Sequence, residues 1–448
     1  MPLAERITAK TALIGIVGLG YVGLPLAVNL ARAGYRVTGI DVNRDKVAAI
    51  NRGESYIQDI AATAIAEQVQ AGRLHAVTHY DSVGELDIIF ICVPTPYSES
   101  KAPDISYIQS AARAIAAHLR PGQLIVLQST TYPGTTEEDV LPILESSGLK
   151  AGRDFHLAFS PERVDPGNRR FTVENTPKVV GGLTPECAEL TRLLLGNLSA
   201  PVHVVSSPRV AEMTKLLENT FRAVNIALVN ELALLCERMG IDIWEVIQAA
   251  ATKPFGYMPF YPGPGPGGHC IPVDPHYLAW KARQYDFSSR FIELAAAVNE
   301  AMPYHVVSLV ASALNLQRQA LKGAKVLVLG VAFKKNIDDA RESPARRVIE
   351  GLFREGAEVT YNDPHIPRFS VGGDTMCPHQ IVLASQPLDQ ATVAAQDCLV
   401  ILAAHDAYDY PWLVQTARLI VDAVDATRGV NGRNGKVVRL GAPFAEGR

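Results

Sequence analysis

Cysteine is scarce in this 448-residue sequence, and no two cysteines have the C-x-x-C spacing typical of zinc or redox sites. We therefore expect no metal site. The scattered positions also disfavour a disulfide framework and favour reduced thiols in a cytoplasmic enzyme. The six cysteines are Cys92, Cys187, Cys236, Cys270, Cys377 and Cys398.

A run of basic residues is also missing, because 42 Lys and Arg are spread among 46 Asp and Glu. We therefore expect no nucleic-acid partner, and a small-molecule ligand is favoured. One uncharged stretch, Thr11 to Ala31, is long enough to suggest a membrane helix. Four glycines, a proline and an asparagine interrupt it, so a strand, a tight turn and a helix explain it better. We expect no membrane partner, and the length of the chain predicts two or three domains.

The motif Gly18-Leu19-Gly20-Tyr21-Val22-Gly23 lies between a predicted buried strand and a helix that ends at Gly34. Its glycines allow a tight turn, close approach of the backbone to a pyrophosphate, and close packing of helix on strand. Asp41 ends the next predicted strand, 18 residues past Gly23, where it can accept from a ribose 2'-hydroxyl. The acid favours NAD over NADP, because it would repel a 2'-phosphate. The alternative is a glycine-rich packing turn.

Further strands are predicted over 88–93, 124–128, 155–159 and 202–205, with helices such as 106–119 and 135–147 between them. This alternation predicts a doubly wound parallel sheet, which binds ligands at the carboxyl ends of its strands. Each polar loop at such an end could be ordinary turn chemistry, but their shared edge favours a site. The three loops are Pro94-Thr95-Pro96, Ser129-Thr130-Thr131 and Ser160-Pro161-Glu162-Arg163.

From Pro208 the pattern continues without a breaker to Gly240, which predicts one helix roughly 45 to 50 Å long. Lys215 and Asn219 are four residues apart and share a face of this helix. In a cleft, an ammonium and an amide side by side would suit a developing oxyanion. On the surface they would be an ordinary polar pair, and the sequence leaves both alternatives open. Shorter helices are expected after it, over 242–250, 275–285 and 291–318.

A second α/β pattern begins near Gly323, with strands over 324–329, 357–361, 398–402 and 419–423 and a helix over 344–355. We interpret it as a second Rossmann-like unit and a weak internal repeat. It lacks G-x-G-x-x-G, so a second dinucleotide is not expected. Lys334 and Arg428 lie where strands would end and could hold the phosphates of another nucleotide, unless they are ordinary surface cations.

Residues Phe260 to Pro275 read F-Y-P-G-P-G-P-G-G-H-C-I-P-V-D-P, which excludes a helix or a central strand and predicts a shaped loop. Cys270 and Asp274 at its end are a possible nucleophile and a possible base. The alternative is a tight turn before a helix that opens near Asp274, with Cys270 filling a small apolar gap. The loop alone leaves both open.

Seven motifs follow one another along the chain: GIVGLGYVGLP, VPTP, STTYPGTT, SPERVDPGN, AEMTKLLENTFRAVNIALVNE, PGPGPGGHCIPVDP and AFKKNIDDARESPA. In this order they resemble the UDP-glucose/GDP-mannose dehydrogenase family over nearly the whole sequence. The resemblance implies an NAD domain (1–206), a central helical dimerisation region with the catalytic loop (207–319) and a UDP-sugar domain (320–448). The expected fold is α/β, with two Rossmann-like doubly wound domains joined by a helical region that contains one long helix.

The resemblance also implies site residues. Cys270 would be the nucleophile, and Lys215 and Asn219 its oxyanion partners. Asp274 would activate water or orient the thiol, while Thr130 would hold the catalytic water and Glu162 act as acid or base in hydrolysis. The implied NAD contacts are Gly18, Gly20, Tyr21, Val22, Gly23, Asp41, Lys46, Thr95, Ser129 and Thr130. The implied UDP-sugar contacts are Glu162, Arg163, Lys215, Asn219, Tyr261, Gly265, Lys334 and Arg428.

In this family the C6 alcohol of the sugar gives one hydride to NAD, and the aldehyde is captured by the cysteine as a thiohemiacetal. A second NAD takes a second hydride to leave a thioester, and water releases the uronic acid. A thiolate is needed because an aldehyde has no hydride to give until a nucleophile adds to it. Lys215 would favour that thiolate and hold the charge of each tetrahedral intermediate.

The sequence departs from the glucose branch of the family at three places. It has Gly268-His269-Cys270 where that branch usually has Gly-Ser-Cys, and SPERVDPGN in place of an NPEF-type loop. Residues 252–261 do not match the arginine-bearing loop of the glucose enzymes. These features are similar to the subgroup that acts on UDP-N-acetylhexosamines, particularly UDP-N-acetylglucosamine. UDP-N-acetylmannosamine and UDP-glucose are the alternative substrates.

Two other classes compete with this interpretation. A 3-hydroxyacid or 6-phosphogluconate type dehydrogenase also joins a Rossmann domain to long helices, but it needs neither a thiol nor a second nucleotide domain. A non-catalytic sugar-nucleotide binder would not need every candidate catalytic residue. A homodimer or higher homo-oligomer through the 208–240 helix is implied by the family, although apolar residues on that helix could equally be intrachain core.

Overall fold

The computed structural model describes residues 1–57, 60–98, 101–163, 170–172, 174–198, 201–268, 270–433 and 435–443. Within them the chain forms two compact units. The first comprises Met1–Glu218 with His276–Ser288, and the second Asn219–Pro275 with Ser289–Arg448. The predicted central region is thus divided between the two units, and the division into three domains stays a prediction.

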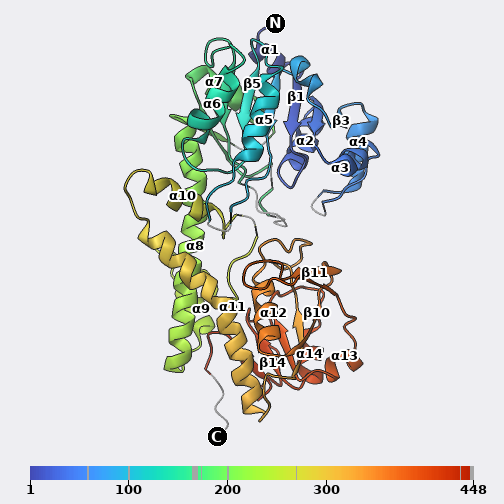
Figure 1. Cartoon of the computed structure of the whole chain (residues 1–448), viewed down its shortest axis with the longest axis vertical. Helices are drawn as coiled ribbons and strands as arrows, with labels where there is room; N and C mark the ends of the chain where they lie inside the picture. Colours follow the sequence, from blue (N-terminus) through green and yellow to red (C-terminus); the bar gives the residue numbers. More distant parts are fainter. Residues whose placement is uncertain are drawn as a thin grey trace. The chain divides into compact units, whose positions relative to one another are not determined.

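The first unit is built on a sheet of which Figure 1 labels β1, β3 and β5. The strand order of this sheet is β3-β2-β1-β4-β5-β6-β7-β8. This order contains the 3-2-1-4-5-6 arrangement of dinucleotide-binding folds, whose ligands lie where the order reverses, between β1 and β4. Its strands are β1 (Leu13–Val17), β2 (Arg36–Ile40), β3 (Leu74–Val77), β4 (Ile88–Ile91), β5 (Leu124–Leu127), β6 (His156–Phe159), β7 (Lys178–Gly182) and β8 (Val202–Val205).

Helices cover both faces of this sheet because its strands are apolar on both sides. Ile88 and Phe90 of β4 pack in one core with residues of α2, α4 and α7, while Ile89 and Ile91 pack on the opposite face with α5. The predicted doubly wound sheet is confirmed. The helical elements are α1 (Leu3–Thr8), α2 (Gly23–Arg32), α3 (Arg44–Asn51), α4 (Ala62–Gln70), η1 (Asp81–Glu85), α5 (Ser106–Ala116), η2 (Thr136–Val140), α6 (Leu141–Glu145), α7 (Pro185–Leu195) and the larger part of α10 (Asp274–Arg283).

One strand pairing differs from the prediction of a parallel sheet. Strand β7, which we did not predict, pairs antiparallel to β6, whereas the other neighbours in this sheet pair parallel. A parallel pairing would need a crossover connection, usually a helix. The described part of the β6–β7 connection contains no helix, so the chain returns in the opposite direction.

The second unit contains a sheet with the order β10-β9-β13-β14-β15, all parallel, and a separate antiparallel pair of β11 with β12. Renumbered from β9, this is the order 2-1-3-4-5 of flavodoxin-like folds, with its switch point between β9 and β13. The strands are β9 (Lys325–Leu329), β10 (Glu358–Asn362), β11 (Arg368–Val371), β12 (Ile381–Ala384), β13 (Cys398–Ile401), β14 (Ile420–Asp422) and β15 (Val437–Arg439).

Both faces of the second sheet are covered as well. Val326 and Val328 of β9 share a core with α11 and α12, whereas Leu327 and Leu329 share one with α13 and α14. The predicted second Rossmann-like unit is therefore confirmed. The helices are α9 (Ile243–Ala251), α11 (Arg290–Leu316), α12 (Pro344–Arg354), α13 (Gln390–Ala394) and α14 (Tyr410–Thr416).

The predicted long helix is α8, Pro208–Met239, which begins in the first unit and continues in the second. Its 32 residues correspond to about 48 Å at 1.5 Å per residue. Within the described ranges, no helix has both the length and the apolarity that crossing a bilayer requires.

Candidate active site

The turn between β1 and α2 needs glycine at two positions for steric reasons. Gly18 has a φ of 89°, and a Cβ there would lie 2.7 Å from the carbonyl oxygen of Cys92. At Gly23 a Cβ would lie 1.9 Å from the carbonyl oxygen of Gly18. A Cβ at Gly20 would instead meet no atom within 4 Å, so the backbone there borders open space. The turn thus packs helix on strand and leaves room for a pyrophosphate, as NAD requires.

Tyr21 and Val22 complete this turn. Val22 directly precedes α2, and both side chains are half-buried and pack against the core on the α2 side of the sheet.

Asp41 follows β2, and its carboxylate organises the same turn. One oxygen accepts from the backbone N–H of Leu19 at 2.8 Å, and the other from that of Asn43 at 2.9 Å. Lys46 lies 3.8 Å from the first oxygen and 5.8 Å from the centre of the Tyr56 ring. An ionised carboxylate has about four lone-pair positions, so Asp41 can still accept from ribose hydroxyls.

The three predicted polar loops do follow β4, β5 and β6. Thr95 and Ser129 are buried, and Thr130 is half-buried. The carbonyl oxygen of Thr95 accepts from the Tyr277 hydroxyl, while the Ser129 hydroxyl donates to the carbonyl oxygen of Val93 at 2.7 Å. Ser129 has only one hydroxyl hydrogen, so towards a ligand it retains only its capacity to accept.

Glu162, after β6, is held by a buried ion pair that our sequence analysis missed. Its carboxylate accepts from Lys178 Nζ at 2.8 and 2.9 Å, from Gln128 Nε2 at 3.0 Å and from the backbone N–H of Arg163 at 2.8 Å. The exposed fraction of the side chain is 2% for Lys178 and 15% for Glu162. A lysine this deeply buried needs a charged partner, so Lys178 fixes the Glu162 carboxylate.

The same cluster explains the state of Cys92. Burial raises the pKa of its thiol, the charge of Glu162 raises it further, and Lys178 opposes the shift. Cys92 therefore remains a neutral thiol. In the sequence, this cluster could have been suspected only from Lys178, a charged residue at the start of the otherwise apolar run K-V-V-G-G.

Arg163 and Lys215 are both on the first unit. Arg163 pairs with Glu218 of α8 at 2.7 Å and donates to the carbonyl oxygen of Pro177 at 2.7 Å. Lys215 is 8% exposed and Asn219, one turn further along α8, is 4% exposed. The alternative of a solvated polar pair is therefore wrong, and the face that carries both residues is buried.

The loop before α10 belongs to the second unit, and its glycines let it pack closely against other residues of that unit. Gly265 and Gly268 have φ of 113° and 83°, a region that favours glycine. A Cβ at Gly268 would lie 2.8 Å from the Phe333 ring, and one at Gly267 would lie 2.5 Å from the Phe333 side chain. Gly268 also donates its N–H to the carbonyl oxygen of Arg341 at 3.0 Å. The loop has therefore a defined shape, as predicted.

Cys270 and Asp274 end this loop. Cys270 is exposed, so the alternative that it fills an apolar gap is wrong. Asp274 is 1% exposed, begins α10 as predicted, and donates its backbone N–H to the carbonyl oxygen of Cys270 at 2.9 Å. Asn219 Nδ2 donates to its carboxylate at 2.5 Å. This bond uses one amide hydrogen of Asn219 and leaves the second for another acceptor. His269, and residues 164–168 of the SPERVDPGN motif, lie outside the described residues.

Tyr261, near the start of the loop, stacks on Trp244 with the ring centres 6.2 Å apart and the planes 14° apart. Trp244 is anchored by its indole N–H, which donates to the carbonyl oxygen of Leu440 at 2.8 Å. Tyr261 itself is 52% exposed, so a large part of its side chain is available to a ligand or a partner.

Lys334 and Arg428 lie at the carboxyl edge of the second sheet, after β9 and β14, which flank β13. Arg428 is exposed and Lys334 half-buried. The Asp422 carboxylate accepts from the backbone N–H groups of Val424, Ala426 and Thr427 at 2.8–3.1 Å and so fixes the turn before Arg428. Two cations placed by rigid turns at one edge suit the phosphates of a nucleotide.

The two sheets define the class of protein. One carries a complete dinucleotide turn, while the other lacks that turn and presents cations at its carboxyl edge, as in a dehydrogenase with a second phosphate-bearing ligand. Three family models match consecutive parts of the chain: the NAD binding domain (12–198), central domain (209–301) and UDP binding domain (327–428) of the UDP-glucose/GDP-mannose dehydrogenase family. The chain belongs to this family. It is an NAD-dependent nucleotide-sugar dehydrogenase, an oxidoreductase with a UDP-sugar-binding domain.

Curated relatives and solved structures agree with this membership. The UDP-N-acetyl-D-glucosamine 6-dehydrogenase of Pseudomonas aeruginosa is 37% identical over 89% of this chain and 92% of its own. The UDP-N-acetyl-D-mannosamine dehydrogenase of Salmonella typhi is 37% identical over 93% of this chain and 98% of its own. A solved UDP-D-ManNAc dehydrogenase from Pyrococcus horikoshii has a TM-score of 0.85 at 31% identity and covers 96% of this chain and 99% of that one. A UDP-glucose dehydrogenase from Pyrobaculum islandicum has a TM-score of 0.83 at 28% identity, with 96% and 98% covered.

Proposed function

We propose that the protein oxidises the C6 alcohol of a UDP-N-acetylhexosamine, UDP-N-acetylglucosamine first among them, to the uronic acid by a four-electron reaction on Cys270. The observation that carries this proposal is the exposed thiol one turn before a buried Asp274, which is itself hydrogen-bonded to Asn219. Single-step alcohol dehydrogenases need no such nucleophile, whereas an aldehyde must first be captured before it can lose a second hydride.

Residues of this chain would capture the aldehyde and release the acid product. The Cys270 thiolate adds to the C6 aldehyde carbon and forms a thiohemiacetal whose C6 oxygen is an alkoxide. The C–O double bond re-forms as hydride leaves C6, and a thioester remains. NAD, when bound, accepts one hydride in each of the two oxidations. Asn219 and Lys215 would donate to the C6 oxygen whenever it carries negative charge.

Asp274 holds Asn219 and, through its backbone N–H, the Cys270 carbonyl. These bonds support an orienting role for Asp274 more directly than a role as base. Thr130 would hold the water that attacks the thioester. Glu162 would take a proton from that water as the C–S bond breaks and Cys270 leaves as the thiolate.

The proposed substrate contacts are those that the resemblance to the family implies. Lys334 and Arg428 would contact the UDP phosphates, and Arg163, Tyr261 and Gly265 the sugar. The choice of an N-acetylhexosamine is supported by relatives described as UDP-N-acetyl-D-glucosamine 6-dehydrogenase and UDP-N-acetyl-D-mannosamine dehydrogenase. Asp41 and Lys46 would hold the adenosine ribose.

Stoichiometry tests the reaction. With limiting UDP-N-acetylglucosamine the wild type should produce two NADH per sugar and an acid product, and a ratio of one would refute the four-electron route. Cys270→Ser should lose steady-state turnover, because the aldehyde is no longer captured. Cys377→Ser is the matched control, since Cys377 is a partly exposed cysteine on the β11–β12 hairpin, and it should behave as wild type.

Specificity is tested by kcat/KM on UDP-N-acetylglucosamine, UDP-N-acetylmannosamine and UDP-glucose. The proposal expects UDP-N-acetylglucosamine to be the best substrate and UDP-glucose the poorest. A preference for UDP-glucose would contradict the choice of subgroup while leaving the chemistry in place.

We also propose that the protein forms a homodimer through α8. One face of this helix exposes an apolar stripe at helical spacing, so these side chains are not intrachain core. The stripe consists of Val210, Met213, Leu217, Phe221, Leu228, Leu232, Leu235 and Met239. Leu232→Glu should shift the sedimentation coefficient towards the monomer. Glu231→Lys, a charge change at an exposed neighbouring position, should leave it unchanged.

A further inference from the structure

The switch point of the second sheet is bridged by a histidine from the loop after β13. In a sheet of this order, ligands bind outside the carboxyl ends of the two strands at the switch, here β9 and β13. The loop after β9 carries Lys334, and the loop after β13 carries His405. Hydrogen bonds between these two loops therefore decide where the backbone beside Lys334 lies.

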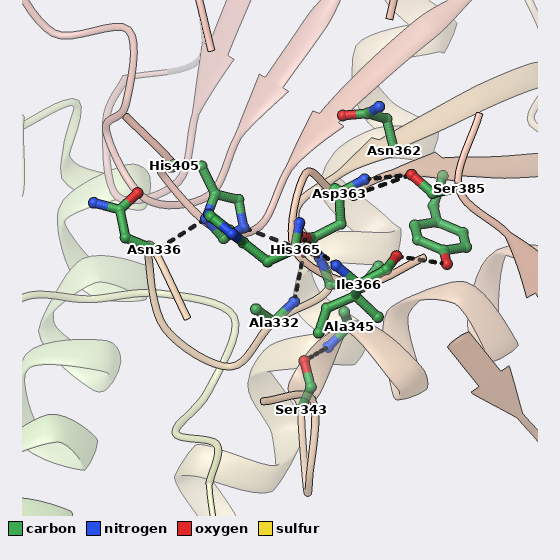
Figure 2. Close-up of polar contacts among 12 residues, drawn as sticks. Ala332, Asn336, Ser343, Ala345, Asn362, Asp363, His365, Ile366, Ser385 and His405 are labelled. Carbon is green, nitrogen blue, oxygen red and sulfur yellow. Dashed lines mark hydrogen bonds and ion pairs between the residues drawn. The ribbon is translucent and has the colours of Figure 1, made fainter. Parts of the chain in front are cut away.

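His405 is fully buried, and its hydrogen bonds define which ring nitrogen carries the proton (Figure 2). Its Nδ1 lies 2.9 Å from the backbone nitrogen of Asn336, which can only donate, so Nδ1 is the acceptor. The hydrogen of the neutral ring is therefore on Nε2, which lies 3.2 Å from the Asp363 carboxylate and donates to it. The ring thus joins the end of β10 to the loop after β9.

Asp363 is occupied entirely within the protein. Its carboxylate accepts from the backbone N–H groups of Val331 and Ala332 at 2.7 and 2.9 Å and from those of His365 and Ile366 at 2.8 and 3.1 Å. Burial raises the pKa of this carboxyl, but the hydrogen bonds from His405 and the backbone outweigh it and lower the pKa below its ordinary value. Asp363 is therefore a fixed anchor for the His405 ring.

The position of Asp363 corresponds to that of Asp41 in the first sheet. Asp41 follows β2, which pairs with β1, and Asp363 follows β10, which pairs with β9. The Asp41 carboxylate accepts from a backbone N–H in the turn after β1, and the Asp363 carboxylate accepts from one in the turn after β9. The Asp41 side chain is 10% exposed, whereas that of Asp363 is 0% exposed. Asp41 can therefore contact a ribose, whereas Asp363, at the corresponding position of the second unit, holds a histidine.

Asn336 forms the other end of the bridge. It has a φ of 60°, an uncommon conformation that asparagine tolerates, and it is two residues past Lys334. Its side chain forms a reciprocal pair with Asp406: Nδ2 donates to the carboxylate at 2.6 Å, and Oδ1 accepts from the backbone N–H at 2.9 Å. Lys335 adds an ion pair to Asp406 at 3.3 Å. Lys335 and Asn336, the two residues after Lys334, are thus both bonded to the β13 loop.

We propose that His405 is a positioning residue for the nucleotide site: by accepting from the Asn336 N–H it holds the loop in the conformation that presents Lys334 to the phosphates of the UDP moiety. This inference rests on the proposed role of Lys334. It concerns the affinity for the nucleotide and leaves the chemistry at C6 unchanged. Only Nδ1 has this role, so substitutions can test it separately from the packing of the ring.

Two substitutions separate the two ring nitrogens. In His405→Asn the amide oxygen can take the place of Nδ1 and accept from Asn336. In His405→Gln the longer amide can take the place of Nε2 and donate to Asp363, but it provides no acceptor at the Nδ1 position. Both variants lose one hydrogen bond and some packing of a buried ring, so both should unfold at a lower temperature than the wild type.

The experiment is calorimetric titration of the full chain with UDP and, separately, with NAD. His405→Asn should bind UDP within about threefold of the wild type, and His405→Gln should bind at least about tenfold more weakly, since the Asn336 N–H loses its acceptor on the β13 loop and the backbone beside Lys334 is released. NAD affinity should be the same in all three proteins. In steady-state kinetics, His405→Gln should raise the KM for the UDP-sugar and leave kcat unchanged.

Asp406→Ala tests the same loop without entering the buried cluster. Asp406 is exposed, so stability should be unchanged, while UDP affinity should fall by about threefold or more as the Asn336 side chain is released. Equal UDP affinity of His405→Gln and wild type would overturn the role of His405, as would equal losses in both His405 variants. A wild type that binds NAD but no UDP would overturn the nucleotide site itself, and this inference with it.

Discussion

The buried ion pair of Lys178 and Glu162 allows a quantitative prediction of the free energy of unfolding of the first unit. Lys178→Met removes the ammonium and leaves the Glu162 carboxylate, 15% exposed, which still accepts from Gln128 Nε2 and from the backbone N–H of Arg163. Breaking a buried ion pair by removing one partner costs about 3–5 kcal/mol. Because these two hydrogen bonds and some solvent remain, we expect the lower end, about 3 kcal/mol.

Glu162→Gln leaves the more deeply buried charge, Lys178 at 2% exposure, and should cost about 4 kcal/mol. The double variant carries neither charge, and replacing both members of a buried pair is often nearly neutral. Its loss should therefore be smaller than the sum of the single losses by several kcal/mol, which is the signature of direct coupling.

Tryptophan fluorescence can report on this unit alone. Of the three tryptophans, Trp280 belongs to the first unit and lies 5.0 Å from the Tyr132 ring centre, whereas Trp244 and Trp412 belong to the second. Urea unfolding in a Trp244→Phe, Trp412→Phe background therefore follows the first unit.

Arg192→Met supplies the matched control. The pair of Arg192 with Glu189 lies on the surface of α7 in the same unit, with exposed fractions of 42% and 52%. Its loss should cost at most about 1 kcal/mol. A cost below about 1 kcal/mol for Lys178→Met, or additive losses in the double variant, would refute the reasoning from burial.

The remaining predictions concern NAD and acid stability. Gly23→Ala places a Cβ 1.9 Å from the Gly18 carbonyl oxygen and should lower both the melting temperature and NAD affinity, whereas Gly20→Ala meets open space and should lower NAD affinity alone; scanning calorimetry and titration separate them. Because the pKa of Asp363 is lowered by folding, its stabilisation is complete above the ordinary value of about 3.9 and is lost as pH falls through the lowered value. Asp363→Asn should lower the free energy of unfolding of the second unit at pH 7, and this free energy should then depend less on pH in acid. Trp412 fluorescence would report the unfolding of this unit. An unchanged dependence on acid pH would contradict the lowered pKa of Asp363.

Local pattern was sufficient to predict the features that depend on local sequence. The dinucleotide turn, the polar loops after β4, β5 and β6, and the breaker-free α8 are each set by neighbouring residues, and the structure has them at the predicted places. The loop of glycine and proline before α10 likewise has the defined shape that its composition requires.

The missed features depend on residues far apart in the chain. Lys178 is buried because β7 lies between β6 and β8, and its partner Glu162 is 16 positions earlier on another strand's loop. Similarly, nothing near His405 in the sequence indicates that Asp363, 42 positions earlier, will hold its ring. Polar residues at the ends of apolar strands were the only local sign of either pair.

The anchored state of Asp363 limits how the second sheet could be redesigned. Introducing three glycines after β9 would supply a phosphate-binding turn, but the acid that should meet the ribose would still be committed to four backbone N–H groups and a histidine. Freeing it would leave those donors without an acceptor inside the core. Converting this sheet into a dinucleotide site would therefore require rebuilding the loops after β9, β10 and β13 together. The two halves of the chain share an architecture, but their ligand specificities cannot be exchanged by a motif transplant.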